Sequence, residues 1–159
     1  ALLAAAQEAC DREVWDRCIN TSERTRNEID IAQRYPQPHR AELLREAQAA
    51  GVDAAYVYGL IRQESRFIMD ARSSVGASGL MQVMPFWMRE LAQADPRRLF
   101  HLRTNVRFGC VILRHYLDRE RGNLANALGR YNGTLGQSDY PNRVFRALRT
   151  RWALGPEGA

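Results

Sequence analysis

The sequence predicts an all-α protein, and three observations support this fold class. Apolar residues recur at helical spacing through most of the chain, residues that cap helices precede several of these segments, and no run alternates as a β-strand does. Of the 159 residues, 45% are hydrophobic and 26% are charged, which suits one folded domain with a short extension and excludes a disordered chain. The longest apolar runs are a few residues, so no segment is expected to span a bilayer.

The first 65 residues are expected to form four helices. These are a helix at 2–17, a helix capped by Thr21 or Ser22 that ends before Pro36, a helix from about Arg40 to Ala50, and a helix from Asp53 to about Ser65. Side-chain oxygens at the starts can accept bonds from free amide groups. Gly51 suits a helix end because glycine readily adopts left-handed backbone.

The remaining residues are expected to alternate between loops and helices. The order is a loop at 66–79, one turn at 80–83, a helix from Pro85 to Leu91, a helix from Thr104 or Asn105 to Arg119, a helix from Asn123 to Arg130, a loop at 131–139 and a last helix at 141–152. Proline suits the first turn of a helix, where its missing amide hydrogen has no partner to lose. No sheet is expected anywhere in this order.

The charge balance is basic but carries no recognisable binding motif. All 23 basic residues are Arg, and the formal net charge is +5. Such a balance favours acidic partners in general. The arginines are spread along the chain without a basic helix or interleaved aromatic residues, so no specific nucleic-acid binding is expected. The chain starts without Met, as a mature form after signal cleavage or a fragment of a longer chain would.

The three cysteines and three histidines predict no metal site. Cys10 and Cys18 would lie ~12 Å apart on one continuous helix and could pair only if that helix breaks between them. Cys110 falls on an apolar helical stripe and is expected to be a buried core residue. No CxxC motif occurs and the histidines lack ligand spacing, so we expect neither a bound metal nor an organic cofactor.

Glu64 is the most informative single residue. It follows Val57, Leu60 and Ile61 at helical spacing, which puts it on the same face as these apolar residues and in the last turn of its helix. Burial and the negative end of the helix dipole both disfavour the carboxylate, so we expect its pKa to be raised. A neutral carboxyl group is what a general acid needs. The alternative is a carboxylate that pairs with Arg62 or Arg66, or that is solvated at the helix end.

A loop rich in serine and glycine follows Glu64 within twenty residues. It reads Ser-Ser-Val-Gly-Ala-Ser-Gly-Leu-Met-Gln over residues 73–82. Its glycines allow the backbone to approach a ligand, and its hydroxyl and amide groups supply the hydrogen bonds that sugars require. Without Glu64, this loop would be interpreted as a plain surface connection.

Three segments together resemble a known enzyme family. Glu64-Ser65, then Gly-Ala-Ser-Gly-Leu-Met-Gln-Val-Met-Pro at 76–85, then Tyr131-Asn132-Gly133 occur in the order found in the soluble-type lytic transglycosylases. These form glycoside hydrolase family 23 and are related to goose-type lysozymes. One departure is Arg-Tyr-Asn-Gly-Thr-Leu at 130–135, where many members have Ala-Tyr-Asn-Ala-Gly-Pro. The departure leaves open the subgroup and the preferred glycan length.

The resemblance implies a lysozyme-like, goose-type fold with an N-terminal helical extension. It divides the chain into the extension at 1–34, a catalytic domain at 35–152 and a tail at 153–159. It implies cleavage of the β-1,4 bond between N-acetylmuramic acid and N-acetylglucosamine in peptidoglycan, without water, to leave 1,6-anhydromuramic ends. The implied partner is the glycan strand, the implied state is a monomer, and the implied location is the periplasm or another exported position in the bacterial envelope.

The resemblance also assigns roles to individual residues. Glu64 would be the single catalytic acid and base, and the hydroxyl group of Tyr131 would contact its carboxyl group. The expected substrate-binding residues are Ser73, Ser74, Gly79, Leu80, Met81, Gln82, Tyr131, Asn132 and Tyr140. Among these, Gly79 to Gln82 would form the wall of the cleft near the scissile bond.

Two other functions remain open from the sequence. A hydrolytic muramidase of the goose-lysozyme type would use the same acid and release reducing ends. A peptidoglycan-binding module would keep the fold with a vestigial Glu64. Mass spectrometry of digested peptidoglycan separates the two enzymes, and a Glu64→Gln variant separates the enzymes from the binding module.

Overall fold

The structure is a computed structural model that describes residues 1–87 and 96–133. Its helices are α1 (Leu2–Asp11), α2 (Trp15–Ser22), α3 (Ile31–Arg34), α4 (Arg40–Ala50), α5 (Ala54–Glu64), the 3-10 helix η1 (Pro96–Phe100), α7 (Leu102–Arg119) and α8 (Leu124–Asn132). Within the described ranges the remaining backbone is loop and turn, with isolated bridges from Ser78 to Arg72 and Val83. The predicted all-α class is confirmed. No described helix is long and apolar enough to cross a membrane.

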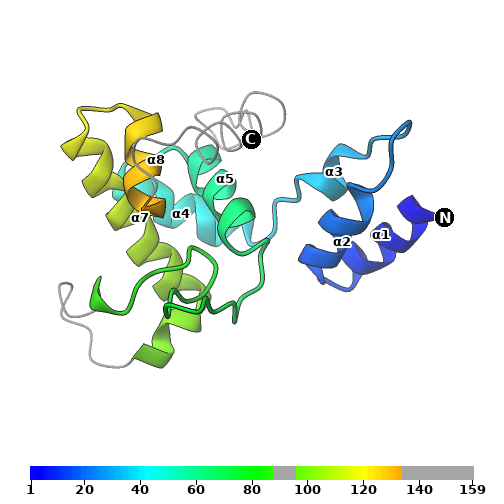
Figure 1. The fold of residues 1–159 in the computed structure, drawn as a ribbon, viewed down its shortest axis with the longest axis horizontal. Coiled ribbons are helices and arrows are strands. Elements are labelled where there is room, and N and C mark those ends of the chain that lie inside the picture. The colour runs from blue at the N-terminus through cyan, green and yellow to red at the C-terminus, as the bar shows by residue number, and fades with distance from the viewer. Residues whose placement is uncertain (88–95, 134–159) are drawn as a thin grey trace.

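The helices form two groups, which Figure 1 shows side by side. The N-terminal unit consists of α1, α2 and α3, and a link at 35–39 leads from it to the larger body. In the body, the long helix α7 packs against α4 and α8, and α5 packs against α4. Fully buried side chains from α5, the following loop, α7 and α8 fill its core, among them Tyr58, Leu60, Met81, Leu113 and Leu128.

The prediction of one helix at 2–17 is wrong, because the chain reverses between α1 and α2. Glu13 adopts left-handed backbone at the reversal, with φ of 60°. The reversal lets α1 and α2 pack face to face and bury Ala6, Cys18 and Ile19 completely, which one straight helix could not do. It also brings the Cα atoms of Cys10 and Cys18 to 5.1 Å, and these cysteines form a disulfide.

The prediction of a helix from Thr21 or Ser22 to Pro36 is also wrong. Both residues lie in the last turn of α2, and only the four residues of α3 are helical before the link, with Asp30 as the cap. Side chains hold the intervening loop instead: the Thr25 hydroxyl group donates to the Ser22 carbonyl, and Arg34 donates to the Thr25 carbonyl. Such side-chain bonds to the backbone compete with helix formation.

The helices of the body agree better with the sequence. Asp53 caps α5, Asn123 caps α8, and Gly51 ends α4 with φ of 72°, all as predicted. The turn near 80–83 is also present. Two ends differ: α7 starts one turn early, with His101 before it, and α8 runs on to Asn132.

Outside these helices, the structure adds one short element that was not predicted, the 3-10 helix η1. Phe86 and Trp87 are helical, but the rest of the predicted helix to Leu91 lies outside the described residues, as do the last helix at 141–152 and the tail at 153–159. Cys110 is fully buried, as predicted; its thiol is free, and burial raises its pKa to about 12.

Candidate active site

Glu64 is the last residue of α5, half-buried at the carboxyl end of the helix. The three apolar residues of its predicted stripe, Val57, Leu60 and Ile61, are fully buried, so the stripe faces the core as expected. Asn132, from the last turn of α8, points its side-chain amide at Glu64, with Nδ2 3.5 Å from Oε1. The fold thus brings together two site residues that lie 68 positions apart in sequence.

The nearby arginines Arg62 and Arg66 form their described ion pairs with another carboxylate. Both bind Glu23, which follows α2 in the N-terminal unit, and Arg66 does so at 3.2 Å. Both arginines thus contact a distant part of the chain.

The chain turns sharply directly after Glu64. Arg66 and Phe67 both adopt left-handed backbone, with φ of 49° and 66°. Neither is glycine, and each such residue costs of order 1–3 kcal/mol unless its surroundings impose the conformation. Here the aromatic ring of Phe67 is buried beside Tyr58, which holds the turn in place. Strain of this kind commonly occurs at functional sites, and this turn directs the following loop back over the end of α5.

Ser65 connects the helix end to the loop. Its Oγ donates to the carbonyl of Leu80 at 2.7 Å and accepts the amide of Phe67 at 3.2 Å. The residue is buried, so both bonds are shielded from water. One side chain therefore fixes the turn after Glu64 and the segment that lies across from it.

Asn105 organises the loop from the opposite side. Its Oδ1 accepts the amide of Met81 at 2.7 Å, and its Nδ2 donates to the carbonyls of Ser78 at 2.8 Å and Leu99 at 2.7 Å. The residue is 1% exposed, and its side-chain amide bonds to these three backbone groups in place of water. The sequence predicted only that Asn105 could cap a helix. The one hint that it is buried was its position directly before Val106, the first residue of the apolar stripe that contains Cys110.

Gly79 is required where the loop passes α7. It has φ of 76°, and a Cβ atom there would lie 2.2 Å from Asn105 Nδ2 and 2.5 Å from the Leu99 carbonyl oxygen. On α7 itself, a Cβ at Gly109 would lie 2.3 Å from the Met81 sulfur. These two glycines allow the loop to lie directly on the helix, which is closer than any other residue type permits.

The predicted loop residues divide into buried and polar ones. Leu80 and Met81 are fully buried, so their side chains support the loop from beneath. Gln82 donates to the carbonyls of Ala71 and Gly79 at 3.1 and 2.8 Å.

The two serines at the start of this loop differ from each other. Ser73 Oγ accepts the amides of Val75 at 3.3 Å and Ala77 at 3.0 Å, so it shapes the loop backbone. Ser74 is exposed. Of the pair, only Ser74 presents an exposed side chain to solvent.

Tyr131 joins α8 to the same loop. Its hydroxyl group donates to the Met81 carbonyl at 2.7 Å. Burial raises the pKa of Tyr131 well above its usual range, and the charge of Glu64 raises it further. The hydroxyl group thus stays protonated as a donor. Tyr140 lies outside the described residues.

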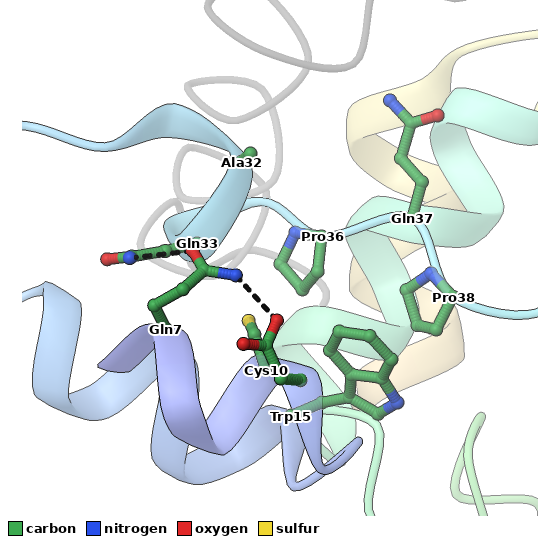
Figure 2. Close-up of a pocket in the computed structure, with 9 residues that line it drawn as sticks. Gln7, Cys10, Trp15, Ala32, Gln33, Pro36, Gln37 and Pro38 are labelled. Atoms are coloured by element: carbon green, nitrogen blue, oxygen red, sulfur yellow. Dashed lines mark hydrogen bonds between the residues drawn. The ribbon is translucent and has the colours of Figure 1, made fainter. Parts of the chain in front are cut away.

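A hollow of about 290 Å³ lies where the N-terminal unit meets the link. Trp15, Pro36 and Pro38 line one side, and Figure 2 shows Gln33 donating to Gln7 on the other. None of its lining residues comes from α5 or from the loop after it. Among the residues that the structure describes, no group of three or more His, Cys, Asp or Glu side chains could hold a metal ion.

Comparison with known proteins identifies the family. Residues 43–150 match the family model described as "Transglycosylase SLT domain". The chain belongs to this family. The match includes Glu64, the loop and α8, and it begins within α4, so the N-terminal unit lies outside it.

Relatives of known name agree with this SLT assignment. A soluble lytic murein transglycosylase of Salmonella typhimurium is 24% identical over 139 residues, which cover 83% of this chain and 22% of the relative. A transglycosylase of Enterobacteria phage PRD1 is 32% identical over 107 residues, covering 61% of this chain and 38% of the relative. The chain thus spans about a fifth of the length of the soluble relative.

Solved structures show the same fold. An inactive glutamate-to-glutamine variant of the lytic transglycosylase Slt from Pseudomonas aeruginosa matches with a TM-score of 0.77 and 32% identity, over 94% of this chain and 24% of that one. The 70-kDa soluble lytic transglycosylase in complex with bulgecin A matches with a TM-score of 0.73 at 23% identity, over 89% of this chain and 24% of that one. Both matches extend over nearly all of the chain, so the predicted lysozyme-like fold with its N-terminal extension is confirmed.

Proposed function

We propose that this SLT domain is a lytic transglycosylase that cleaves peptidoglycan glycan strands with Glu64 as its single acid and base. The observation that supports this most strongly is the convergence of three segments on Glu64: the end of α5, the turn and loop tied down by Ser65 and Asn105, and Asn132 of α8. The inactive glutamate-to-glutamine variant of the Pseudomonas relative is consistent with one essential glutamate in this family.

The proposed reaction uses one protein carboxyl group twice. Glu64 first protonates the glycosidic oxygen between N-acetylmuramic acid and N-acetylglucosamine, and the 2-acetamido oxygen of the substrate stabilises the positive anomeric carbon. The carboxylate then accepts the proton of the C6 hydroxyl group, which attacks C1 and closes the 1,6-anhydro ring. Most glycoside hydrolases need a second carboxylate as nucleophile or base. Here the substrate takes over both tasks, and tethering makes its hydroxyl group an effective nucleophile.

In this proposal the other site residues orient Glu64, hold the loop or contact the sugar. Asn132 orients the carboxyl group of Glu64, and Tyr131 holds the Met81 carbonyl and thereby the loop. Gly79, Leu80 and Met81 fix the loop against α7, and Ser73 and Gln82 shape its backbone. Ser74 and Tyr140 are proposed to contact the sugar.

The proposal includes the setting of the enzyme. Its substrate places it in the periplasm or elsewhere in the bacterial envelope, acting as a monomer on glycan strands, without a metal or organic cofactor. Residues 35–152 form the catalytic domain, 1–34 the N-terminal extension and 153–159 a tail. The disulfide between Cys10 and Cys18 is consistent with an oxidising compartment.

The test is the chemistry of the product. Purified peptidoglycan is digested and analysed by mass spectrometry, and we expect muropeptides lighter by one water than hydrolytic products. Glu64→Gln keeps the shape of the side chain but cannot donate a proton, so turnover should fall by at least roughly 10³-fold with the melting temperature unchanged. Reducing ends would indicate a muramidase instead, and full activity of Glu64→Gln would indicate a different acid.

A further inference from the structure

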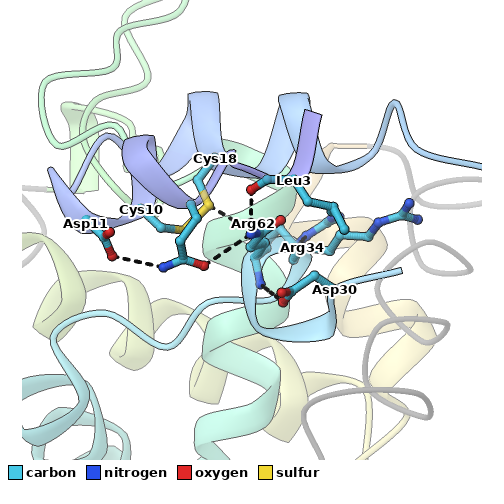
Figure 3. The surroundings of a disulfide bond; sticks show 9 residues. Leu3, Cys10, Asp11, Cys18, Asp30, Arg34 and Arg62 are labelled. Carbon is cyan, nitrogen blue, oxygen red and sulfur yellow. Dashed lines mark hydrogen bonds between the residues drawn. A yellow bond between two sulfur atoms is a disulfide. The ribbon is translucent and has the colours of Figure 1, made fainter. Parts of the chain in front are cut away.

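Arg62 is a charged side chain buried at an internal contact. It lies on α5, two residues before Glu64, and its side chain is only 7% exposed. Its Nε donates to the Arg34 carbonyl at 2.8 Å, and its guanidinium carbon lies 4.4 Å from the centroid of the Tyr35 ring. A third contact is the ion pair with Glu23. All three partners belong to the N-terminal unit or the link, and Figure 3 shows Arg62 next to Arg34 beside the disulfide.

Glu23 binds a second arginine on the other side of Glu64. The carboxylate oxygen that receives Arg62 also receives Arg66, at 3.2 Å. Arg66 is the first left-handed residue of the sharp turn that leads into the loop. One carboxylate thus joins the end of α5 to the turn that follows, on both sides of Glu64 in the sequence.

Glu23 is itself held firmly in place. It is the C-cap of α2, and its amide donates to the carbonyl of Ile19, a fully buried residue. The disulfide from Cys10 to Cys18 fastens α2 to α1 one turn before this point. The backbone of Glu23 is therefore fixed at the end of α2, and its side chain, which is 34% exposed, is held by the two arginines.

We propose that Glu23 is a positioning residue for the active site: through Arg62 and Arg66 it holds the carboxyl end of α5 and the turn after it in the geometry that the reaction needs. This inference rests on the proposed role of Glu64. If so, the N-terminal unit, which lies outside the family match, contributes to the geometry of the active site. A catalytic group must be held within a fraction of an ångström, and small displacements by distant changes lower the rate strongly.

Glu23→Gln tests the proposal because it removes the charge and keeps the shape. We expect kcat to fall roughly tenfold on peptidoglycan, with KM within about twofold of wild type, at a temperature where circular dichroism shows the variant fully folded. Glu23→Asp keeps the charge and should recover part of the loss. The matched control is Glu8→Gln, which removes an exposed pair with Arg12 in the same unit and should leave kcat unchanged.

A double-variant cycle with Arg66 completes the test. Arg66 is about a third exposed on its side chain, so Arg66→Gln is expected to fold even if Glu23→Gln does not. Arg66→Gln alone should also lower kcat, and the double variant should lose much less than the product of the two single losses. Wild-type kcat in both single variants, or losses that multiply, would overturn the proposal. If wild-type protein makes no anhydro product, the proposed function fails first.

Discussion

The N-terminal unit and the body of this SLT domain are held together by different means. In the body, buried apolar side chains from α4, α5, α7 and α8 form one core, and the helices end where caps and glycines predict. In the N-terminal unit, three short helices bury fewer side chains, among them Ile19, which joins the core of the body, and a disulfide, side-chain bonds to the backbone and an ion pair to Arg62 add to this packing. The comparison teaches that apolar spacing predicts structure well where a large core supplies most of the stability.

The proposed active site lies where these two regions meet. The apolar stripe of α5 places Glu64, but polar contacts shape what surrounds it. Asn105 holds the loop from the side of the body, and Glu23 holds the end of α5 from the side of the N-terminal unit. Variants that remove one contact at a time from each region test whether the N-terminal unit and the body are stabilised differently.

Asn105→Ala should have the largest effect on stability. It leaves the amide of Met81 and the carbonyls of Ser78 and Leu99 buried without this partner, so the free energy of unfolding should fall by about 4 kcal/mol. Urea denaturation followed by circular dichroism measures this loss. A change below about 1 kcal/mol would mean that the loop does not depend on Asn105.

Removal of the disulfide should have a smaller and more local effect. Replacing Cys10 and Cys18 together by Ser opens a loop of eight residues, which should cost about 2 kcal/mol. Hydrogen exchange should increase in α1 and α2 and remain unchanged in α7 and α8, because the core of the body does not include the disulfide. Faster exchange throughout the body would show that the two regions unfold as one unit.

Two helix caps give the smallest and most closely matched comparison. Asp30 caps α3 in the N-terminal unit, with Oδ1 3.0 Å from the Gln33 amide, and Asn123 caps α8 in the body, with Oδ1 3.0 Å from the Asn126 amide. Replacing either by Ala should cost about 1 kcal/mol. Hydrogen exchange should show local loosening for Asp30→Ala and a lower global stability for Asn123→Ala. The same pattern for both would remove the distinction between the two regions.

The sequence predicted the helix that ends at Glu64 and missed the contacts that support this helix end. Glu64 was identified from the apolar stripe, and Asn132 from the family resemblance, because both signals lie in short stretches of sequence. Asn105 and Glu23 were not identified as site residues, because all of their side-chain contacts except the one from Asn105 to Leu99 lie 24 to 43 positions away along the chain. No local pattern shows which distant backbone group a buried amide or carboxylate will meet.

By itself, the sequence determined the helices of the body, the place of Glu64 at the end of α5 and the family to which the chain belongs. These follow from spacing, caps and short motifs, which act within a few residues. Only the tertiary structure decided that the helix at 2–17 breaks so that Cys10 and Cys18 pair, and that Arg62 points into the N-terminal unit. The physical reason is that a buried charge or a disulfide needs a partner that the whole fold brings close. Such a partner lies at no fixed distance along the sequence, so no local pattern predicts it.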